Sequence, residues 1–337
     1  MTKPVTYEAA GVSIREADKL VAHLRAGNKL IGGFSGLFPL RTRGMKRPML
    51  AASTDGVGTK LLVAQMSRKL ATIGIDLVAM VVNDLIVCGA QPLFFLDYFA
   101  TGRLNAREAK TILRGVIKGC EIAGMPLLGG ETAEMPGLYK PEEFDLAGFG
   151  VGIVDGAKII DGRRIKPGDL VFGFESSGLH SNGYSLARRV LLESSGLRAD
   201  VRMKELGESL MSAMLRPTKI YVKLASCLRK ARADIKGFAH ITGGGIPGNL
   251  CRVLPRGADA FVFKNRWETP PIFKLIQRLG PVDYGEMLRT FNMGIGFMAV
   301  AAPGEHARIM RAALAAGERA LVVGEIVKGC GKTMVEL

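Results

Sequence analysis

Two short segments of the sequence place acidic residues beside glycines, and the first of them also contains a lysine. They are Ser53-Thr54-Asp55-Gly56-Val57-Gly58-Thr59-Lys60 and Leu128-Gly129-Gly130-Glu131-Thr132-Ala133-Glu134-Met135-Pro136-Gly137. Glycines let backbone N–H groups approach phosphate oxygens, carboxylates bind magnesium, and a lysine ammonium offsets negative charge. The two segments therefore predict a site for a magnesium-bound nucleotide.

Residues 72–88 predict a helix buried in the core, because the segment is apolar on nearly all sides. Its polar residues Asp76, Asn83 and Asp84 fall within about a quarter turn of one another. Buried carboxylates are costly unless they are paired or bind a metal, so Asp84 is a candidate metal ligand. The alternative is that both aspartates are hydrogen-bonded within the protein or paired with arginines.

Two loops in the second half of the chain each follow a predicted strand and precede a predicted helix. Residues 176–183 follow the strand 170–174, and the triple glycine 243–245 follows the strand 237–241. The first N–H groups of a helix are unpaired and attract anions. Two of the four histidines, His180 and His240, lie in these segments. They are candidates for phosphate binding or proton transfer, the alternative being loop histidines that bond only to backbone.

The elements that would position these residues alternate between strands and helices. Strands are predicted at 48–53, 93–99 and 144–154, and helices at 59–69, 105–124, 183–190 and 247–253. Asn105 has the spacing of a helix N-cap, and Gly124 that of a helix end. Because 337 residues exceed one typical core, and because residues 156–169 are rich in turns, we expect two domains, 1–165 and 166–337. The fold class is mixed α/β.

The composition favours a cytoplasmic protein that binds small anions. The formal net charge of +15 suits polyanions, but the basic clusters at 41–47 and 163–166 are short and lack aromatic residues, so we expect a solvated surface and no specific nucleic-acid partner. Five scattered cysteines without a C-x-x-C pair indicate neither a zinc site nor disulfides. No export signal or apolar run of the roughly 18 residues needed for a membrane span is present.

Common nucleotide motifs do not fit the glycines. Gly58-Thr59-Lys60 and Gly331-Lys332-Thr333 lack the spacing of a P-loop. Gly148, Gly150 and Gly152 lie inside a predicted strand and lack the pattern of a dinucleotide fold. The nucleotide site must therefore be of another kind.

Further motifs run in order over nearly the whole chain. They lie at residues 7–12, 31–38, 55–60, 73–90, 94–98, 129–137, 176–185, 215–221, 240–245 and 289–296. Together they closely resemble the phosphoribosylformylglycinamidine cyclo-ligase family, also called AIR synthetases. Because the likeness extends along the chain, it is far more specific than any single glycine loop.

The resemblance implies a cytosolic homodimer of purine biosynthesis. Family members use ATP and magnesium to convert formylglycinamidine ribonucleotide (FGAM) to aminoimidazole ribonucleotide (AIR), and they release ADP and phosphate. The implied fold has an N-terminal domain whose sheet pairs with that of the partner into a shared barrel, and a C-terminal α/β domain. The alternatives are a sibling ATP-dependent kinase or synthetase of the same superfamily, and a protein that binds polyanions without catalysis.

The resemblance also implies roles for particular residues. Metal binding is assigned to Asp55, Asp84 and Glu131. ATP binding is assigned to Gly32, Gly33, Asp55, Gly56, Gly58, Thr59, Lys60, Asn83 and Asp84, with the Gly32-Gly33 loop as a mobile cover or, alternatively, a plain turn. Substrate binding is assigned to Ser181, Asn182, Gly243 and Gly244, and catalysis to His180 and His240. Some fold relatives carry an aspartate at the position of His240, so the number of magnesium ions stays open.

Overall fold

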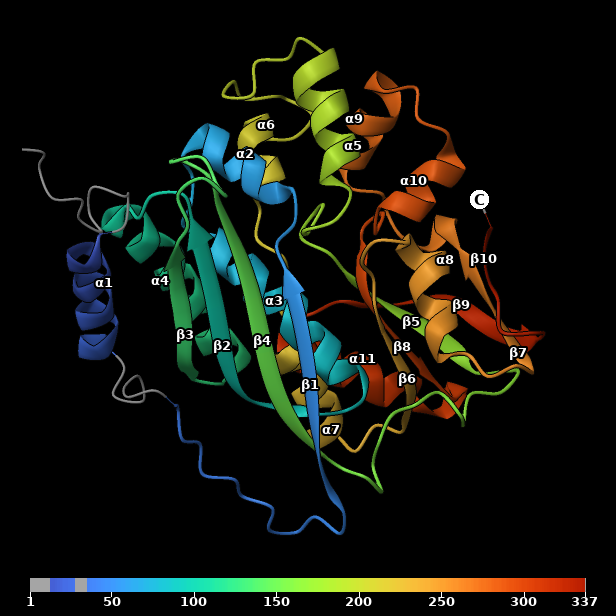
Figure 1. Ribbon diagram of the computed structural model, residues 1–337. Coiled ribbons are helices and arrows are strands. Elements are labelled where there is room, and N and C mark those ends of the chain that lie inside the picture. The colour runs from blue at the N-terminus through green and yellow to red at the C-terminus, as the bar shows by residue number, and fades with distance from the viewer. Residues whose placement is uncertain (1–12, 28–34, 337) are drawn as a thin grey trace, which may run out of the picture.

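The computed structural model describes residues 13–27 and 35–336. Figure 1 shows two regions, each built on a β-sheet with helices packed against it. A four-stranded sheet has the order β1-β4-β2-β3, and a six-stranded sheet has the order β10-β7-β9-β5-β8-β6. The expected mixed α/β fold with two domains is confirmed. The division at residues 165 and 166 stays a prediction.

The first domain carries a sheet of long strands that the sequence located well. Strands β1 and β2 both pair antiparallel with β4, and β2 pairs parallel with β3. The strand predicted at 48–53 continues through Asp55, so that this aspartate lies at the end of β1. The strands are β1 (Pro48–Gly56), β2 (Gln91–Thr101), β3 (Leu127–Glu134) and β4 (Phe144–Asp155).

Four helices accompany this sheet: α1 (Ile14–Gly27), α2 (Lys60–Ser67), α3 (Ile73–Val87) and α4 (Ala106–Ala123). As predicted, Asn105 caps α4 by accepting two backbone N–H bonds, and Gly124 ends it in the left-handed conformation. Helix α3 packs closely on β4, where a Cβ at Gly148 or Gly150 would come within about 3 Å of side chains of α3. The glycines that do not form a dinucleotide motif thus allow a helix to lie close to the sheet.

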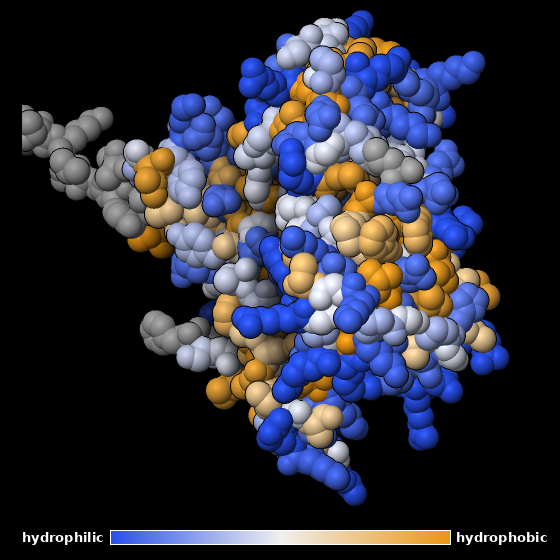
Figure 2. Space-filling model, turned by 90° about the vertical axis from the view of Figure 1, so that its right-hand side faces the viewer, coloured by the Kyte–Doolittle hydropathy of each residue, from blue (hydrophilic) through white to orange (hydrophobic). Residues whose placement is uncertain are grey.

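The opposite face of this sheet is open to solvent and partly apolar. Figure 1 shows its strands in front of α3 with no helix of the described residues across them. Leu50, Tyr98 and Phe149 are 62%, 39% and 42% exposed there. Figure 2 shows another face of the molecule, the right-hand side of Figure 1. On that face, hydrophobic residues occur in separate groups among hydrophilic ones. An exposed apolar sheet face of this kind is typical of an interaction surface.

The second domain has a more fully buried sheet. Every residue of β6 and β8 is buried, because helices and loops cover both faces. The predicted helix that reaches residue 190 is instead a short α-helix followed by a π-helical turn, 189–194. The strands are β5 (Leu170–Glu175), β6 (Ile235–His240), β7 (Ala258–Phe263), β8 (Ile295–Ala301), β9 (Ala320–Lys328) and β10 (Thr333–Glu336). The helices are α5 (Tyr184–Arg188), α6 (Leu210–Met214), α7 (Val222–Lys230), α8 (Gly245–Leu250), α9 (Pro271–Leu279), α10 (Tyr284–Thr290) and α11 (His306–Ala316).

Helix α3 connects the two domains. Its N-terminal half, including Leu77, packs in the core beneath the first sheet, whereas Ile86 packs with Phe172 and Phe297 of the second domain. The polar residues at both ends of α3 therefore lie where the domains meet. Among the described residues, no helix is long and apolar enough to cross a membrane.

Candidate active site between the domains

The glycine-rich loop after β1 lies against a loop of the second domain. The Thr59 and Ser185 hydroxyls are 3.4 Å apart, and a Cβ on Gly58 would lie 3.9 Å from the carbonyl oxygen of Ser181. Gly58 has a φ of 71°, a conformation that side chains other than glycine rarely adopt. Two of the segments that the sequence singled out are thus neighbours, although more than 120 residues separate Thr59 from Ser185.

The end of α3 and the end of β6 bring together an acid and a histidine. His240 Nδ1 lies 2.8 Å from Asp84 Oδ1, and His240 Nε2 lies 3.4 Å from the amide nitrogen of Asn83. Since that amide nitrogen can only donate, Nε2 accepts and Nδ1 carries the proton that is donated to Asp84. The imidazole is buried, whereas the Asp84 side chain is 47% exposed. His240 thus holds an accessible carboxylate in place.

Asp55 and Asp84 form an acidic pair at this site. Burial raises the pKa of the half-buried Asp55, and the negative charge of Asp84 raises it further, while His240 opposes the rise. Asp55 also accepts a 2.8 Å hydrogen bond from the N–H of Gly56. Two carboxylates whose charges repel each other can be stabilised by a shared cation.

A cavity of about 310 Å³ opens beside this pair. Asp84 and His240 line it together with Ser53, Asn249 and Arg252. Arg252 supplies a positive charge near the acidic pair, and the sequence analysis missed it because a lone exposed arginine on a helix carries no signal of its own. The site therefore contains both cation-binding and anion-binding groups.

The triple glycine beside this cavity is held by Asn249. Its side-chain amide donates to the carbonyl oxygens of Thr242, Gly243 and Gly245 at 2.8–3.3 Å. Gly244 and Gly245 have φ angles of 96° and 59°, and a Cβ on Gly245 would lie 1.8 Å from a backbone oxygen. Only glycine fits this conformation. Asn249 thus fixes the conformation of the loop, and both Asn249 and Thr242 line the cavity.

The structure argues against the prediction that Lys60 contacts phosphate. Its side chain is fully buried and forms an ion pair of 2.8 Å with Asp76. The ammonium also donates to the carbonyl oxygens of His180 and Arg216, at 3.0 and 2.7 Å. With three partners, all three ammonium hydrogens are used. Burial lowers the pKa of Lys60 and Asp76 opposes that shift, so the lysine ties α2 to α3 and to the second domain.

Two further residues assigned to ligands are occupied within the protein. Asn83 is fully buried, and it accepts from the N–H of Tyr221 and donates to the carbonyl oxygen of Lys219. Ser181 donates to Asp76 and lies 2.9 Å from the Thr218 hydroxyl. Both side chains therefore hold α3 against the second domain, and neither is free for ATP or substrate in this arrangement.

Asn182 differs from its neighbour Ser181. Its side-chain nitrogen is buried and has no hydrogen-bond partner among the described residues, and its side-chain oxygen faces Gly243. A buried amide donor without a partner is costly, which is expected where a ligand supplies the acceptor. Asn182 thus lies beside Gly243, and the assignment of Asn182, Gly243 and Gly244 to substrate binding stays a prediction.

His180 lies deeper than a proton carrier requires. The residue is 1% exposed, has a φ of 61°, and accepts a hydrogen bond from the N–H of Ser177 at Nε2. Burial holds the pKa of His180 well below its ordinary value, and nearby positive groups add to that effect. The imidazole is therefore neutral, and its contacts fit a residue that fixes the loop 176–183.

Glu131 does not join the acidic pair. It lies on β3, whereas Asp55 lies on β1 at the opposite edge of the four-stranded sheet, so the two are about 14 Å apart by strand spacing. No cluster of three metal-ligating side chains forms among residues 13–27 and 35–336. Within the described part of one chain, Glu131 therefore lies apart from Asp55 and Asp84, and its role in metal binding stays a prediction. Gly32 and Gly33 lie outside the described residues.

Asp97 is a buried carboxylate that the sequence analysis passed over. It lies on β2, two strands from Asp55, and is 9% exposed. Burial raises the pKa of Asp97 to about 7, and Glu131 adds to the rise. Its position within the apolar strand 93–99 hid it, because no local pattern distinguishes it from a residue at a strand surface.

Comparisons with known proteins cover both domains. The family model "AIR synthase related protein, N-terminal domain" matches residues 42–154, and "AIR synthase related protein, C-terminal domain" matches residues 166–336. Among solved structures, the hydrogenase maturation protein HypE in complex with ATP has a TM-score of 0.69 at 17% identity and covers 97% of this chain and 92% of its own. Thiamine-monophosphate kinase from Stenotrophomonas maltophilia has a TM-score of 0.65 at 17% identity, with 95% of each chain covered. At these identities the likeness concerns the fold alone.

Closer relatives are similar over nearly the full length of the sequence. A protein of Thermodesulfovibrio yellowstonii named phosphoribosylformylglycinamidine cyclo-ligase is 49% identical over 96% of this chain and 97% of its own. A protein of Myxococcus xanthus with the same name is 50% identical over 97% of both chains. With these matches, the chain belongs to the phosphoribosylformylglycinamidine cyclo-ligases, the ATP-dependent ligases of purine biosynthesis also called AIR synthetases.

Proposed function

We propose that this chain closes the imidazole ring of AIR from FGAM, with ATP converted to ADP and phosphate. The observation that carries the proposal is the identity of 49–50% over almost the whole length of relatives named for this reaction. The acidic pair and the glycine loops support it, because they lie together where the two domains meet.

The chemistry explains why ATP is needed. An amide oxygen is a poor leaving group, so the terminal phosphoryl group of ATP is transferred to the formyl oxygen of FGAM, which gives an imidate phosphate and ADP. The neighbouring nitrogen then attacks the former formyl carbon, the carbon–oxygen bond breaks, phosphate leaves, and a proton is lost from nitrogen. Ring closure within one molecule is favoured by proximity. The protein must hold the phosphates, stabilise negative charge and accept a proton.

We assign Asp55 and Asp84 to the magnesium ion that accompanies ATP. Hard carboxylate oxygens suit this ion, and the effect of Asp84 on the pKa of Asp55 supports their closeness. When bound, the ion offsets phosphate charge and orients the transferred group. His240 acts as a positioning residue, because its Nδ1 hydrogen bond fixes the carboxylate of Asp84. Glu131 is not assigned to this ion, and it binds either a separate ion or none.

Phosphate and substrate contacts fall to backbone and to a few side chains. The loop 57–59 lies beside Ser181 and Ser185 of the second domain, and its backbone N–H groups suit phosphate oxygens. Asn182 has a free amide donor beside Gly243, and Arg252 takes the cationic role that Lys60 cannot fill. Lys60, Ser181 and His180 position these groups without touching the ligands.

We further propose that the chain forms a homodimer through the open face of its first sheet. The exposed apolar side chains Leu50, Tyr98 and Phe149 support this, since a two-fold pairing would remove the same patch of each copy from water. Pairing of the two sheets would give the shared barrel that the family resemblance implies.

The dimer is tested by replacing Phe149 with glutamate. Light scattering on a sizing column should show a dimer for the wild type and a monomer for Phe149→Glu. The matched control is Leu314→Glu, a change of the same kind at an exposed leucine of α11, which should leave the dimer intact. A Phe149→Glu protein that remains dimeric would exclude this interface.

A cytoplasmic location fits the cysteines. All five lie within the described residues and are free, as expected for a reducing compartment. We also expect no specific nucleic-acid partner, in keeping with the short basic clusters.

The activity is tested by incubating the protein with FGAM, ATP and magnesium and measuring AIR as the diazotisable aminoimidazole. ADP and AIR should form in equal amounts. ADP that forms without AIR would indicate a sibling kinase or synthetase, and retention of RNA without any ATP turnover would indicate a polyanion-binding protein.

A further inference from the structure

A second cavity among the described residues is separate from the acidic pair. It measures about 560 Å³ and lies between the end of the first sheet, the helix α7 and the start of β6. A volume of this size is typical of small-molecule sites. It is not the cavity that contains Asp84 and His240, although Phe238 lines both.

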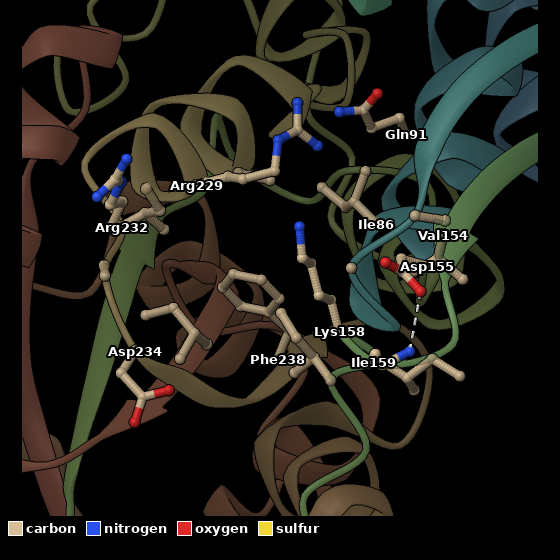
Figure 3. A pocket seen from close by; sticks show the side chains of 18 of the residues that line it. Ile86, Gln91, Val154, Asp155, Lys158, Ile159, Arg229, Arg232, Asp234 and Phe238 are labelled. Atoms are coloured by element: carbon tan, nitrogen blue, oxygen red, sulfur yellow. Dashed lines mark hydrogen bonds between the residues drawn. The ribbon is translucent and has the colours of Figure 1, made fainter. Parts of the chain in front are cut away.

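One wall of the cavity is apolar. Ile86 of α3, Ile153 of β4, Leu228 of α7 and Phe238 of β6 contribute to it. Figure 3 shows the ring of Phe238 and the side chain of Ile86 on either side of the Lys158 side chain. A flat ring can pack between an aromatic and aliphatic side chains in such a space.

The other wall is positively charged. Lys158, Arg229 and Arg232 line it, and none of the three forms an ion pair with an acidic side chain among the described residues. Figure 3 shows the ammonium of Lys158 and the guanidinium of Arg229 directed toward the same space. Arg229 faces the side-chain oxygen of Gln91, and burial lowers the pKa of Arg229.

The acids of the cavity do not balance this charge. Asp155 accepts hydrogen bonds from the N–H groups of Lys46, Arg47 and Ala157. Asp234 is paired with Arg164 at 2.8 Å. A partly buried guanidinium without a carboxylate partner costs desolvation energy, which a bound anion would offset.

We propose that this cavity binds a nucleoside phosphate, with the base against Phe238 and Ile86 and the phosphate between Lys158 and Arg229. The charges select an anion, and the apolar wall selects one with a flat ring. The site lies close to the reaction machinery, because Ile86 follows Asp84 by two residues on α3 and Phe238 precedes His240 by two on β6.

The test is calorimetric titration of AMP into the protein while a non-hydrolysable ATP analogue and magnesium fill the reaction site. We expect saturable binding of one AMP per chain, with adenosine and inorganic phosphate each binding at least tenfold more weakly. Arg229→Gln and Lys158→Gln should each weaken AMP binding about tenfold. The matched control is Lys230→Gln, the same loss of charge next along α7 but outside the cavity, which should leave binding unchanged.

Three outcomes of the AMP titrations would overturn the proposal. They are no saturable AMP binding, AMP binding that is unaffected by both cavity variants, and phosphate binding as tight as that of AMP. Competition between AMP and the ATP analogue would assign the binding to the reaction site and would likewise overturn it. Because the readout is binding, failure here is distinct from failure to make AIR, and a thermal unfolding profile of each variant verifies that it is folded.

Discussion

The two ends of helix α3 carry the same kinds of residues in opposite settings. At its start, Asp76 is fully buried and is bonded to Lys60, Ser181 and Thr218. At its end, Asp84 is half exposed, is bonded to His240, and faces a cavity. The first aspartate has its partners within the chain, whereas the second uses one carboxylate oxygen for His240 and has a half-exposed side chain.

This difference teaches which acids can bind a ligand. A buried carboxylate that is paired with a lysine holds the structure together, because breaking the pair leaves a charge without a partner. A carboxylate that a histidine orients at the edge of a cavity can bind a cation at little cost. The comparison predicts that changes at the two ends of α3 separate stability from activity.

The largest effect is expected at the end of α3 that carries Asp84. Asp84→Asn should lower the rate of AIR formation by about three orders of magnitude, or ~4 kcal/mol, because a magnesium ligand is lost. The free energy of unfolding should change by less than about 1 kcal/mol, since the side chain is half exposed. Turnover and urea unfolding of the same variant check this. A variant with a much lower free energy of unfolding but wild-type turnover would contradict the comparison.

A change at the start of α3, where Asp76 is buried, should mainly lower the free energy of unfolding. Lys60→Met leaves Asp76 as a buried charge without its ion pair, so we expect a loss of about 3–5 kcal/mol in the free energy of unfolding. The double variant Lys60→Met/Asp76→Asn should recover part of that loss, because no unpaired charge remains. Urea unfolding of the single and double variants measures the coupling, and additive effects would show that the pair does not act as a unit.

A smaller effect is expected from Asp97 as pH changes. Its pKa of about 7 in the folded chain lies above the value of 3.8 expected when unfolded, so the unfolded chain loses this proton first. The free energy of unfolding should therefore decrease as the pH rises from about 4 to about 7, by about 2–4 kcal/mol at most. Asp97→Asn should remove this part of the pH dependence. If the wild type and Asp97→Asn show the same pH dependence of unfolding, the pKa of Asp97 is not raised by folding.

The smallest effect is expected at His240, which acts through Asp84. His240→Gln should raise the magnesium concentration needed for half-maximal turnover by about 10–100-fold, or roughly 1.4–2.7 kcal/mol, because the carboxylate is no longer held. Excess magnesium should restore most of the turnover. If turnover stays low at saturating magnesium, the imidazole takes part in the chemistry itself.

Much of the fold could be predicted because its signals are local. The caps of α4 at Asn105 and Gly124 and the apolar pattern of α3 gave both helices to within two residues. The π-helical end of α5 was missed, because it has no pattern of its own. The length of the chain and the turn-rich segment 156–169 predicted two domains, and the family resemblance implied the same architecture.

The site was predicted less completely because burial is not a local property. Spacing places Asp76, Asn83 and Asp84 on one side of α3, but it does not say which of them meets a partner in a distant segment. Lys60 follows a glycine loop as a phosphate ligand would, yet its nearest partners are residues 16, 120 and 156 positions away. Glu131, like Asp55, lies beside glycines in the sequence, yet the two residues are on opposite edge strands of the sheet.

The central claim is that Asp55 and Asp84 together hold the magnesium ion of ATP. Its most direct test is the magnesium dependence of kcat/KM for AIR formation in Asp55→Asn, measured beside thermal unfolding. We expect kcat/KM to fall by at least about 1,000-fold at every magnesium concentration while the unfolding midpoint stays within a few degrees of the wild type. Turnover equal to that of the wild type in a folded Asp55→Asn protein would contradict the claim.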